Sequence, residues 1–228
     1  SNVLQSEGLD PNLISKLCVG KSENQRRAYL YQIIRSSVDV DKMDFVLRDS
    51  YHTGAGYGGV DIFRLIYTMD VLNGNLAVDV TALSTLESFI LARLESFRTI
   101  YFHKTSRAAQ IMLLKALENA KDDLGIAQLG SVDEYLALDD EVVWATLRRN
   151  PKSRTIVEDL NRRKLLKCAY EKTFFVKDQL VTNIFNNESV RVQIEEEIAG
   201  KADLLREDVT IDVPSLPSVP YHYAVDIE

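Results

Sequence analysis

Two stretches of the sequence gather side chains suited to binding a metal ion or a phosphate. In the first, SSVDVDKMDFVLRDSYHTG, the residues Asp41, Phe45 and Asp49 step by four. On a helix this spacing places the two carboxylates on one side, within about two turns. Crowded carboxylates repel one another unless a cation neutralises them. The pattern predicts either a metal-facing carboxylate with substrate-binding neighbours, or a solvated helix with an ion pair between Asp44 and Arg48.

The second stretch, FRTIYFHKTSRA, lies inside a long helical pattern and is rich in cationic and aromatic side chains. At about 100° per residue, one helix face would carry Arg93, Phe97, Lys104, Arg107 and Ala108, with Tyr101 at its edge. Arginine and lysine suit a polyphosphate, and a tyrosine ring suits a sugar or a base. The alternative is a solvated stripe on a core helix.

Helices are the elements that must position both stretches. Apolar spacing and caps predict them after Asp10-Pro11 and over residues 22–35, 40–50, 61–70, 82–120, 139–149 and 188–199, the last ending at Gly200. Ser131 and Glu134 form a capping box for one more short helix. The span 82–120 contains neither proline nor glycine, so it is predicted as one long helix with room for a kink.

Strands are predicted only in short stretches, at 76–78, 164–176 and 209–213. The glycine-rich segment TGAGYGG, residues 53–59, is predicted as a flexible turn, since no GK[ST] follows that would make it a phosphate loop. The fold class is therefore mainly α. We expect an all-α part over residues 1–120 and a smaller α+β region over residues 121–228.

Composition narrows the classes of function. The 228 residues include 27 Lys+Arg and 34 Asp+Glu, a formal charge of −7, which disfavours non-specific binding of nucleic acid. The two cysteines, Cys18 and Cys168, form no metal-binding or disulfide pattern, which favours a reducing compartment. No apolar run is long enough to span a bilayer, and the N-terminus lacks a signal-peptide layout. We expect a cytoplasmic protein with no membrane partner.

The two stretches together resemble a known family. Residues 38–54, VDVDKMDFVLRDSYHTG, resemble the last conserved motif of HD-domain phosphohydrolases, and RLESFRTIYFHKTSR resembles the downstream helix of their deoxynucleoside-triphosphate triphosphohydrolase group. The resemblance covers residues 30–110 well and the remainder loosely. It implies that residues 1–120 are the C-terminal helices of an HD-type domain.

The resemblance also implies roles for individual residues of the first stretch. In that family the Asp before the Lys of the DVDK motif is a metal ligand, which here is Asp41. Lys42 would contact a substrate phosphate, and Asp49 would approach the sugar 3′ hydroxyl. Phe45 stands where the family often carries tyrosine, so it would keep the contact of the ring with the sugar but not the hydroxyl.

Roles for the second stretch follow in the same way. Arg93 would bind phosphate. Tyr101, His103 and Lys104 match the family's YxHK motif, with roles on the sugar and the phosphates. Arg107 stands where some relatives have an amide, so the resemblance assigns it no role.

One departure limits what this chain would do alone. The family's metal site also needs a His and a His-Asp pair, and no His-Asp dipeptide occurs in the sequence. One carboxylate cannot hold a catalytic divalent ion. We therefore expect the C-terminal part of a metal-dependent phosphohydrolase acting on (deoxy)nucleotides, inactive as this piece, whose divalent ion binds only when the N-terminal part is supplied.

Two alternatives remain at this point. One is a catalytically dead nucleotide-binding or oligomerisation module, and the other is an unrelated α-rich interaction protein. The C-terminal region lacks a dense ionisable cluster, so we interpret it as structural or oligomeric. The resemblance implies a homo-oligomer, because HD triphosphohydrolases usually assemble into dimers or tetramers and long helices often form such contacts.

Overall fold

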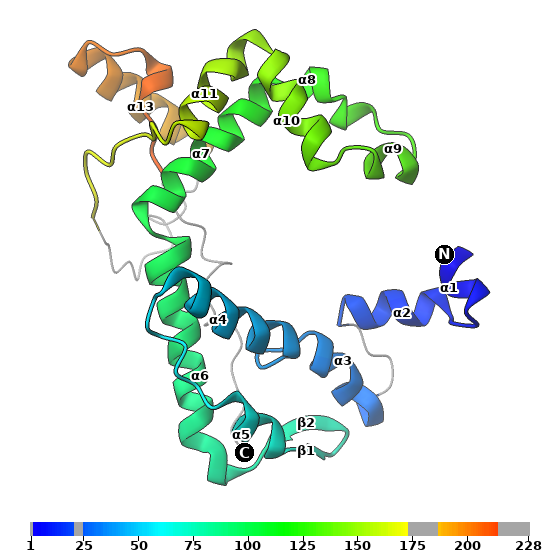
Figure 1. The fold of residues 1–228 in the computed structure, drawn as a ribbon. Coiled ribbons are helices and arrows are strands. Elements are labelled where there is room, and N and C mark those ends of the chain that lie inside the picture. The colour runs from blue at the N-terminus through cyan, green and yellow to red at the C-terminus, as the bar shows by residue number, and fades with distance from the viewer. Residues whose placement is uncertain (1, 21–24, 173–186, 214–228) are drawn as a thin grey trace. The chain divides into compact units, whose positions relative to one another are not determined.

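The computed structural model describes residues 2–20, 25–172 and 187–213, and these are almost entirely helical (Figure 1). Contacts divide the chain after Ile100 into two compact units, the second of which runs from Tyr101 to Ser215. This division falls earlier in the chain than the boundary near residue 121 that the sequence predicts. The assignment of residues 1–120 and 121–228 to separate domains stays a prediction.

The first unit contains six α-helices among its described residues, together with one hairpin. Their bounds are α1 (Asn2–Ser6), α2 (Pro11–Cys18), α3 (Ala28–Ile34), α4 (Val40–Thr53), α5 (Ile62–Tyr67), β1 (Met69–Leu72), β2 (Asn75–Val78) and α6 (Leu83–Ser96). Aspartates start several of these helices, because a carboxylate accepts hydrogen bonds from the free amides of the first turn. Asp10, Asp39 and Asp61 do so for α2, α4 and α5.

The core of the first unit joins three of these helices. Its buried members are Met43 and Val46 from α4, Ile62 and Leu65 from α5, and Phe89 and Ala92 from α6. The side chains of Val46, Leu65 and Phe89 are fully buried. This core fixes α4 against α6, the two helices that carry the predicted site residues of this unit.

The hairpin corrects one predicted helix. Residues 61–70 were expected to be helical throughout, but α5 ends at Tyr67 and β1 begins at Met69. The strands pair antiparallel around the predicted Asn73-Gly74 turn, with Met69 opposite Val78. The two-residue turn, in which both residues have positive φ, favours a hairpin over a longer helix.

The predicted single long helix is interrupted. After α6 the backbone forms a π-helical turn over Phe97–Tyr101, and α7 (Lys104–Asn119) starts anew with His103 as its N-cap. A π turn changes the rotation per residue, so the phase of one face does not continue through it. The expected stripe from Arg93 to Ala108 is therefore wrong as a single helix face, and Ala108 is buried.

The second unit contains, besides α7, the described helices α8 (Lys121–Leu124), α9 (Val132–Leu136), α10 (Asp140–Arg149), α11 (Pro151–Asn161) and α13 (Glu188–Ala202). Helix α7 packs mainly against α11 and α8, and α10 packs against both of these. Its core contains Ala116, Ala120, Leu124, Leu147 and Val157. Alanines on α7 allow α11 to approach closely, and the buried Ser153 Oγ donates to the carbonyl of Ala116 at 2.7 Å.

The C-terminal part of the second unit differs from expectation in three places. Residues 164–172 and 209–213 form no strand, and residues 173–176 of the first expected strand lie outside the described residues. Helix α13 passes through Gly200 and ends at Asp203, which adopts the left-handed conformation. Within the described ranges the strands are β1 and β2, so the mainly α class is confirmed while the sheet lies in the first unit.

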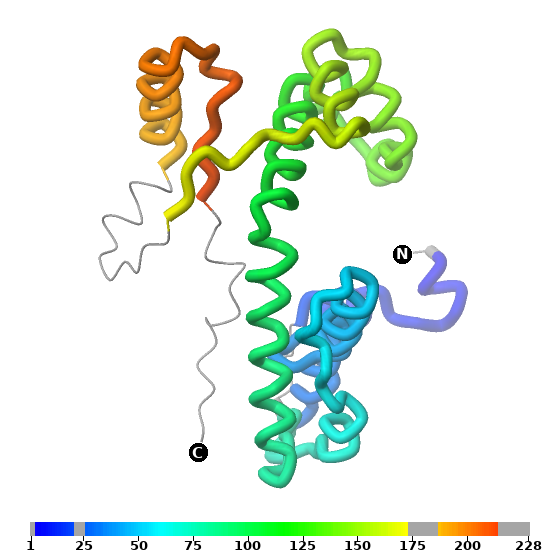
Figure 2. The backbone as a smooth tube through the Cα atoms, turned by 60° about the vertical axis from the view of Figure 1, so that its left-hand side comes forward, coloured from blue at the N-terminus to red at the C-terminus, as the bar shows by residue number. Residues whose placement is uncertain are grey.

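The segment after α13 runs back alongside α7 (Figure 2). It includes a 3₁₀ turn over Arg206–Asp208. Lys115 of α7 donates to the carbonyl of Glu207 at 3.0 Å. No helix of the described residues is long and apolar enough to cross a membrane.

Candidate functional site

The start of α4 is organised by a buried carboxylate. Asp39 is 1% exposed. Its side chain accepts from the amide of Ser36 at 2.9 Å, from the amide of Lys42 at 2.8 Å, and from the Lys42 ammonium. The burial of a carboxylate is costly unless it is paired and hydrogen-bonded, and Asp39 satisfies both conditions. The residue therefore fixes the backbone just before the predicted metal ligand and also orients the lysine that follows it.

Asp41 and Lys42 occupy the first turn of α4 but have different environments. Asp41 is exposed, and its side chain makes no hydrogen bond or ion pair with any residue in the described ranges. The Lys42 side chain is only 20% exposed, because its ammonium pairs with Asp39. The helix start thus presents one carboxylate to solvent beside one cation that is already oriented.

Arg93 joins α6 to this helix start. Its Nη1 donates to the carbonyl of Ser37 at 3.3 Å, two residues before Asp39. This hydrogen bond brings the Arg93 guanidinium to the start of α4 within the first unit. The sequence could not supply the contact itself, because it joins residues that are far apart in the chain.

Further along α4, the predicted sugar-binding residues face partly inward. Phe45 packs, half-buried, against the first core. The Asp49 side chain is 23% exposed and lies 3.7 Å from Nη1 of Arg48. Arg48 also donates from Nε to Asp44 at 3.0 Å, which is the ion pair expected from the solvated-helix interpretation. Arg48 therefore pairs both with the surface carboxylate of Asp44 and with the candidate residue Asp49.

The glycine-rich segment is folded against α4. Ser50 Oγ donates to the carbonyl of Ala55 at 2.6 Å and accepts from the amide of Gly58 at 2.9 Å. A Cβ built on Gly58 would lie 2.4 Å from Ser50 Oγ, so only glycine fits there without movement. The segment is a turn, as predicted, and it makes specific contacts with the helix.

This turn places Tyr57 near Asp49. The Tyr57 hydroxyl is buried and has no hydrogen-bond partner among the described residues. Burial, and then the charge of Asp49, raise the pKa of the Tyr57 phenol above its usual value. Sequence reasoning did not select Tyr57. The signal available was an aromatic residue between glycines, directly after the candidate helix.

The start of α7 holds the YxHK residues, within the second unit. His103 is exposed, and its Nδ1 accepts from the amide of Thr105 at 3.2 Å. This bond makes Nδ1 the acceptor, which leaves the proton of a neutral imidazole on Nε2. Lys104 is exposed in the first turn, whereas Tyr101 is partly buried. The structure thus brings the three residues together around one helix start.

Arg107 has a clear structural partner. Its Nε and Nη2 donate to the two oxygens of Asp212 at 2.7 and 2.5 Å, and its Nη1 donates to Gln110 at 2.8 Å. A guanidinium that meets a carboxylate in this fork geometry makes a strong and directional contact. Arg107 therefore ties the C-terminal segment to α7.

The described residues do not by themselves form a metal site. No group of three or more His, Cys, Asp or Glu side chains within them is close enough to hold an ion. Asp41 offers a single exposed carboxylate, and the nearby Asp39 is occupied by its three donors. This donor set does not fit a divalent cation, which requires several ligands.

Comparison with known proteins identifies the family of this chain. The family described as "HD associated region" matches residues 60–225. The chain belongs to this family and is an HD-domain phosphohydrolase-like protein.

Two curated relatives are much longer than this chain, which matches only part of each. An uncharacterised protein of Methanocaldococcus jannaschii, MJ1154, is 28% identical over 201 residues, which cover 84% of this chain and 42% of that protein. The deoxynucleoside triphosphate triphosphohydrolase SAMHD1 homolog of Dictyostelium discoideum is 28% identical over 221 residues, covering 91% of this chain and 39% of that protein. The chain therefore spans less than half the length of either relative.

Solved structures share the fold. A phosphohydrolase from Bacteroides thetaiotaomicron superposes with a TM-score of 0.63 at 19% identity, covering 91% of this chain and 55% of that one. A hypothetical protein from Aquifex aeolicus gives a TM-score of 0.63 at 25% identity, covering 85% and 50%. Half of each neighbouring structure has no counterpart in this chain.

Proposed function

We propose that this chain is the substrate-binding, C-terminal part of a metal-dependent HD-family phosphohydrolase that acts on (deoxy)nucleotides. The observation that carries the proposal is the contact of Arg93 with the carbonyl of Ser37. This contact places a guanidinium of α6 beside the helix start that presents Asp41 and Lys42. A site for phosphate next to a metal-binding carboxylate requires this combination of one carboxylate and converging cations.

Each residue of the first unit has a defined task in this proposal. Lys42 and Arg93 offset the charge of the phosphates, and Asp39 keeps the Lys42 ammonium in position. Asp49 accepts a hydrogen bond from the sugar 3′ hydroxyl, and the Phe45 ring packs against the sugar. Asp41 supplies one of several metal ligands, and the others come from outside this chain. A divalent ion so bound would lower the pKa of a water molecule and provide a hydroxide near neutral pH.

The residues of the second unit are proposed to act on the same class of ligand. Tyr101 and His103 contact the sugar or the phosphates, and Lys104 binds a phosphate. The relation to the triphosphohydrolase from Dictyostelium supports a deoxynucleoside triphosphate as the substrate. Products would be a nucleoside and triphosphate, or a dephosphorylated nucleotide.

Binding can be tested on this chain without any metal. Thermal unfolding with and without dATP should show stabilisation, which reaches about 2.7 kcal/mol at a ligand concentration of 100 Kd. Lys42→Gln and Lys104→Gln should each weaken binding about 10-fold. Lys201→Gln is the matched control, because Lys201 is an exposed lysine that pairs only with Glu197 on α13. Unchanged affinity in both site variants would remove these lysines from the proposal.

The catalytic part of the proposal would need a longer polypeptide that supplies a His and a His-Asp pair as further ligands. In that protein Asp41→Asn should reduce bound metal and abolish release of phosphate products. Metal content measured by mass spectrometry separates this effect from unfolding. Retention of full metal content would show that Asp41 is not a ligand.

A catalytically inert nucleotide-binding or oligomerisation module is the second candidate. It is favoured by the single available ligand, since no further metal-binding group accompanies Asp41 in the described ranges. The two candidates differ in one measurement. An inert module binds dATP but hydrolyses it at no metal concentration, even as the full-length gene product.

A further inference from the structure

A hollow on the surface of the second unit has the volume and the lining of a small-molecule site. Its volume is about 570 Å³, which lies within the range of about 300–1,000 Å³ that ligand pockets occupy. The proposed function uses none of the residues around it. They come from α10 and from the end of α11, and they are Asp140, Glu141, Trp144, Ala145, Arg148 and Asn161.

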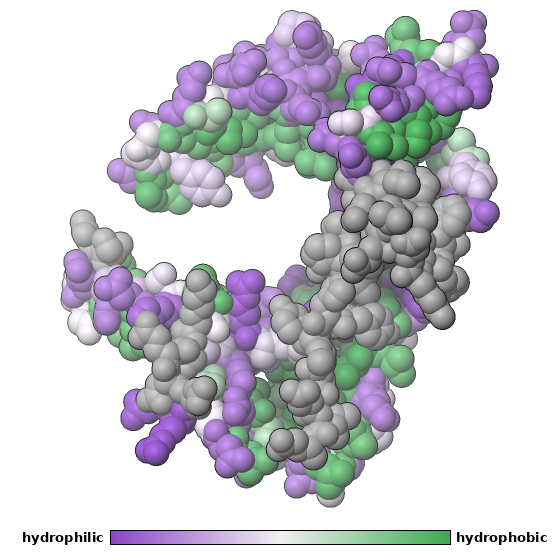
Figure 3. Space-filling model, turned by 180° about the vertical axis from the view of Figure 1, so that it is seen from behind, coloured by the Kyte–Doolittle hydropathy of each residue, from purple (hydrophilic) through white to green (hydrophobic). Residues whose placement is uncertain are grey.

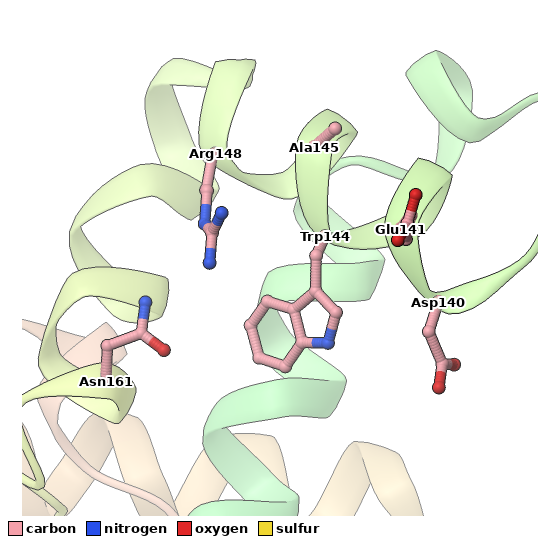
Figure 4. Close-up of a pocket in the computed structure, with 6 residues that line it drawn as sticks. All are labelled: Asp140, Glu141, Trp144, Ala145, Arg148 and Asn161. Atoms are coloured by element: carbon pink, nitrogen blue, oxygen red, sulfur yellow. The ribbon is translucent and has the colours of Figure 1, made fainter.

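The polar side chains of this hollow are available to a ligand. Within the part of the chain that the structure describes, none of its charged or amide side chains makes a hydrogen bond or an ion pair with another residue; these are Asp140, Glu141, Arg148 and Asn161. Trp144 also packs against the second core, so its indole is held in place before a ligand arrives. Figure 4 shows the indole between Arg148 and Asn161 on one side and the two carboxylates on the other.

The lining favours a charged ligand over an apolar one. An apolar ligand would find more apolar surface on α9, and Figure 3 shows such surface at the α9 end of this unit. Val132 and Leu136 of that helix are 72% and 68% exposed. The hollow instead places charges of both signs around one indole, and charged groups of this kind fix the orientation of a polar ligand.

The two ends of the hollow suit opposite charges. At one end the carboxylates of Asp140 and Glu141 lie beside the indole of Trp144, and both kinds of group attract a cation. A guanidinium fits this end better than an ammonium, because its plane stacks on an aromatic ring and its N–H groups bind a carboxylate as a fork. At the other end Arg148 and Asn161 offer N–H donors to a carboxylate.

Length and net charge narrow the class of ligand further. Asp140 and Arg148 are eight residues apart on α10, or about 12 Å along the helix axis, so a ligand whose two charges are adjacent does not reach both ends. The lining has two carboxylates and one guanidinium, and it therefore carries one net negative charge. Free arginine has a guanidinium at the end of a long side chain, an α-ammonium and a carboxylate, and it carries one net positive charge.

We propose that this hollow binds free arginine. The guanidinium of the ligand lies between the indole of Trp144 and the carboxylates, and its own carboxylate meets Arg148 and Asn161. Each charged end of the ligand then faces the opposite charge, and the complex is neutral. The proposal does not depend on nucleotide binding.

Fluorescence measures binding directly, because Trp144 is the only tryptophan in the chain. Titration with L-arginine should change its emission in a saturable way. L-citrulline has the same shape without the charged guanidinium, and agmatine lacks the carboxylate, so each should bind about 10-fold more weakly. Nα-acetyl-L-arginine imitates the last residue of a polypeptide and lacks the net positive charge, so it should also bind more weakly. The proposal is overturned by the absence of a saturable change with L-arginine, or by equal binding of L-citrulline or of the acetylated ligand.

Substitutions at the two ends assign the orientation of the ligand. Arg148→Gln should weaken L-arginine about 10-fold but leave agmatine unchanged, because agmatine has no carboxylate for Arg148 to bind. Asp140→Asn should weaken both ligands about equally. Arg149→Gln is the matched control, since it makes the same change of charge on α10 outside the hollow and should leave both affinities unchanged. Equal weakening of both ligands in Arg148→Gln, or unchanged affinity in Asp140→Asn, contradicts the proposal, and far-ultraviolet circular dichroism confirms that each variant is folded.

Discussion

The starts of α4 and α7 both carry predicted site residues, yet the two helix starts are built differently. At α4 the cap is the buried Asp39, which accepts from three donors and holds the ammonium of Lys42. At α7 the cap is the exposed His103, which accepts from one amide. A cation that is held by a buried partner is oriented before any ligand arrives, whereas the exposed Lys104 must be ordered by the ligand itself. We therefore expect the α4 site to be preorganised and the α7 site to be adaptable.

The largest expected effect comes from removing the buried cap. Asp39→Ala leaves two amides without an acceptor and the partly buried Lys42 without its partner, so it should lower the free energy of unfolding by about 3 kcal/mol. Asp10→Ala is the matched control, since Asp10 caps α2 with a single hydrogen bond at an exposed position. It should cost about 1 kcal/mol. Urea denaturation measures both, and equal losses would show that burial adds nothing to the Asp39 cap.

The next effect tests whether the glycine-rich turn is a structural part of the α4 site. Gly58→Ala places a methyl group 2.4 Å from Ser50 Oγ and should cost about 2 kcal/mol, because the turn must move. Gly56→Ala is the control, since a Cβ there meets no atom within 4 Å. We expect it to change stability by less than about 0.5 kcal/mol. Equal stability of the two variants would return the segment to the flexible turn that its composition suggested.

The second unit offers a smaller test of the same distinction between buried and exposed carboxylates. Glu195 on α13 is buried and accepts from the amide of Ile211 at 2.8 Å and from Arg206 Nη2 at 3.2 Å. Glu195→Gln should cost about 1.5 kcal/mol, because it removes the charge from both hydrogen bonds. Glu197→Gln alters an exposed pair with Lys201 on the same helix and should leave the unfolding midpoint unchanged.

Hydrogen exchange shows where the Glu195 effect acts. The amides of residues 205–213 should exchange faster in Glu195→Gln than in Glu197→Gln, because Glu195 holds this segment to α13. Equal exchange in the two variants would mean that the contacts with α7, Arg107 to Asp212 and Lys115 to the Glu207 carbonyl, fix the segment.

Features that depend on residues close together in the sequence were predicted, whereas contacts between residues far apart in the chain were not. The caps at Asp10 and Ser131 are local, and the structure contains both. The spacing of Asp41 on a helix was also local. The contact of Arg93 with the carbonyl of Ser37 joins residues far apart in the chain, and the resemblance gave Arg93 a phosphate-binding role without this contact. The π turn before α7 could not be predicted, because no proline or glycine marks it and only packing distinguishes a π turn from a regular helix.

The missed residues share one physical property, which is burial decided by tertiary contacts. Asp39 reads in the sequence as one more acidic residue beside Asp41, but the fold buries one and exposes the other. Tyr57 was hidden in a segment whose glycines suggested flexibility. The Gly200 cap was wrong because the helix continues to Ala202, and Asp203 instead takes the left-handed conformation at its end.

The smallest expected effect is a change in the pKa of Tyr57. Its pKa is raised first by burial and second by Asp49. Asp49→Asn removes the second cause only, so the pKa of Tyr57 should fall toward the ordinary value of about 10 without reaching it. The folded state holds this proton more tightly than the unfolded chain does. The raised pKa of Tyr57 therefore adds to the free energy of unfolding below about pH 10, and this contribution is lost as the pH rises through the pKa of Tyr57 in the folded state.

Tyrosine ¹³Cζ resonances measure this titration, and Tyr57→Phe identifies the signal among the ten tyrosines. An unchanged pKa in Asp49→Asn would show that the carboxylate lies too far away to act on the phenol. A complete return to the ordinary value would instead make Asp49 the dominant cause and burial the minor one. In the first case the Asp49 carboxylate has no electrostatic effect on Tyr57, and the preorganised part of the α4 site ends at Phe45. In the second, the turn and the helix form one electrostatic unit, and a ligand that neutralises Asp49 would shift the Tyr57 resonance by the same amount as the substitution.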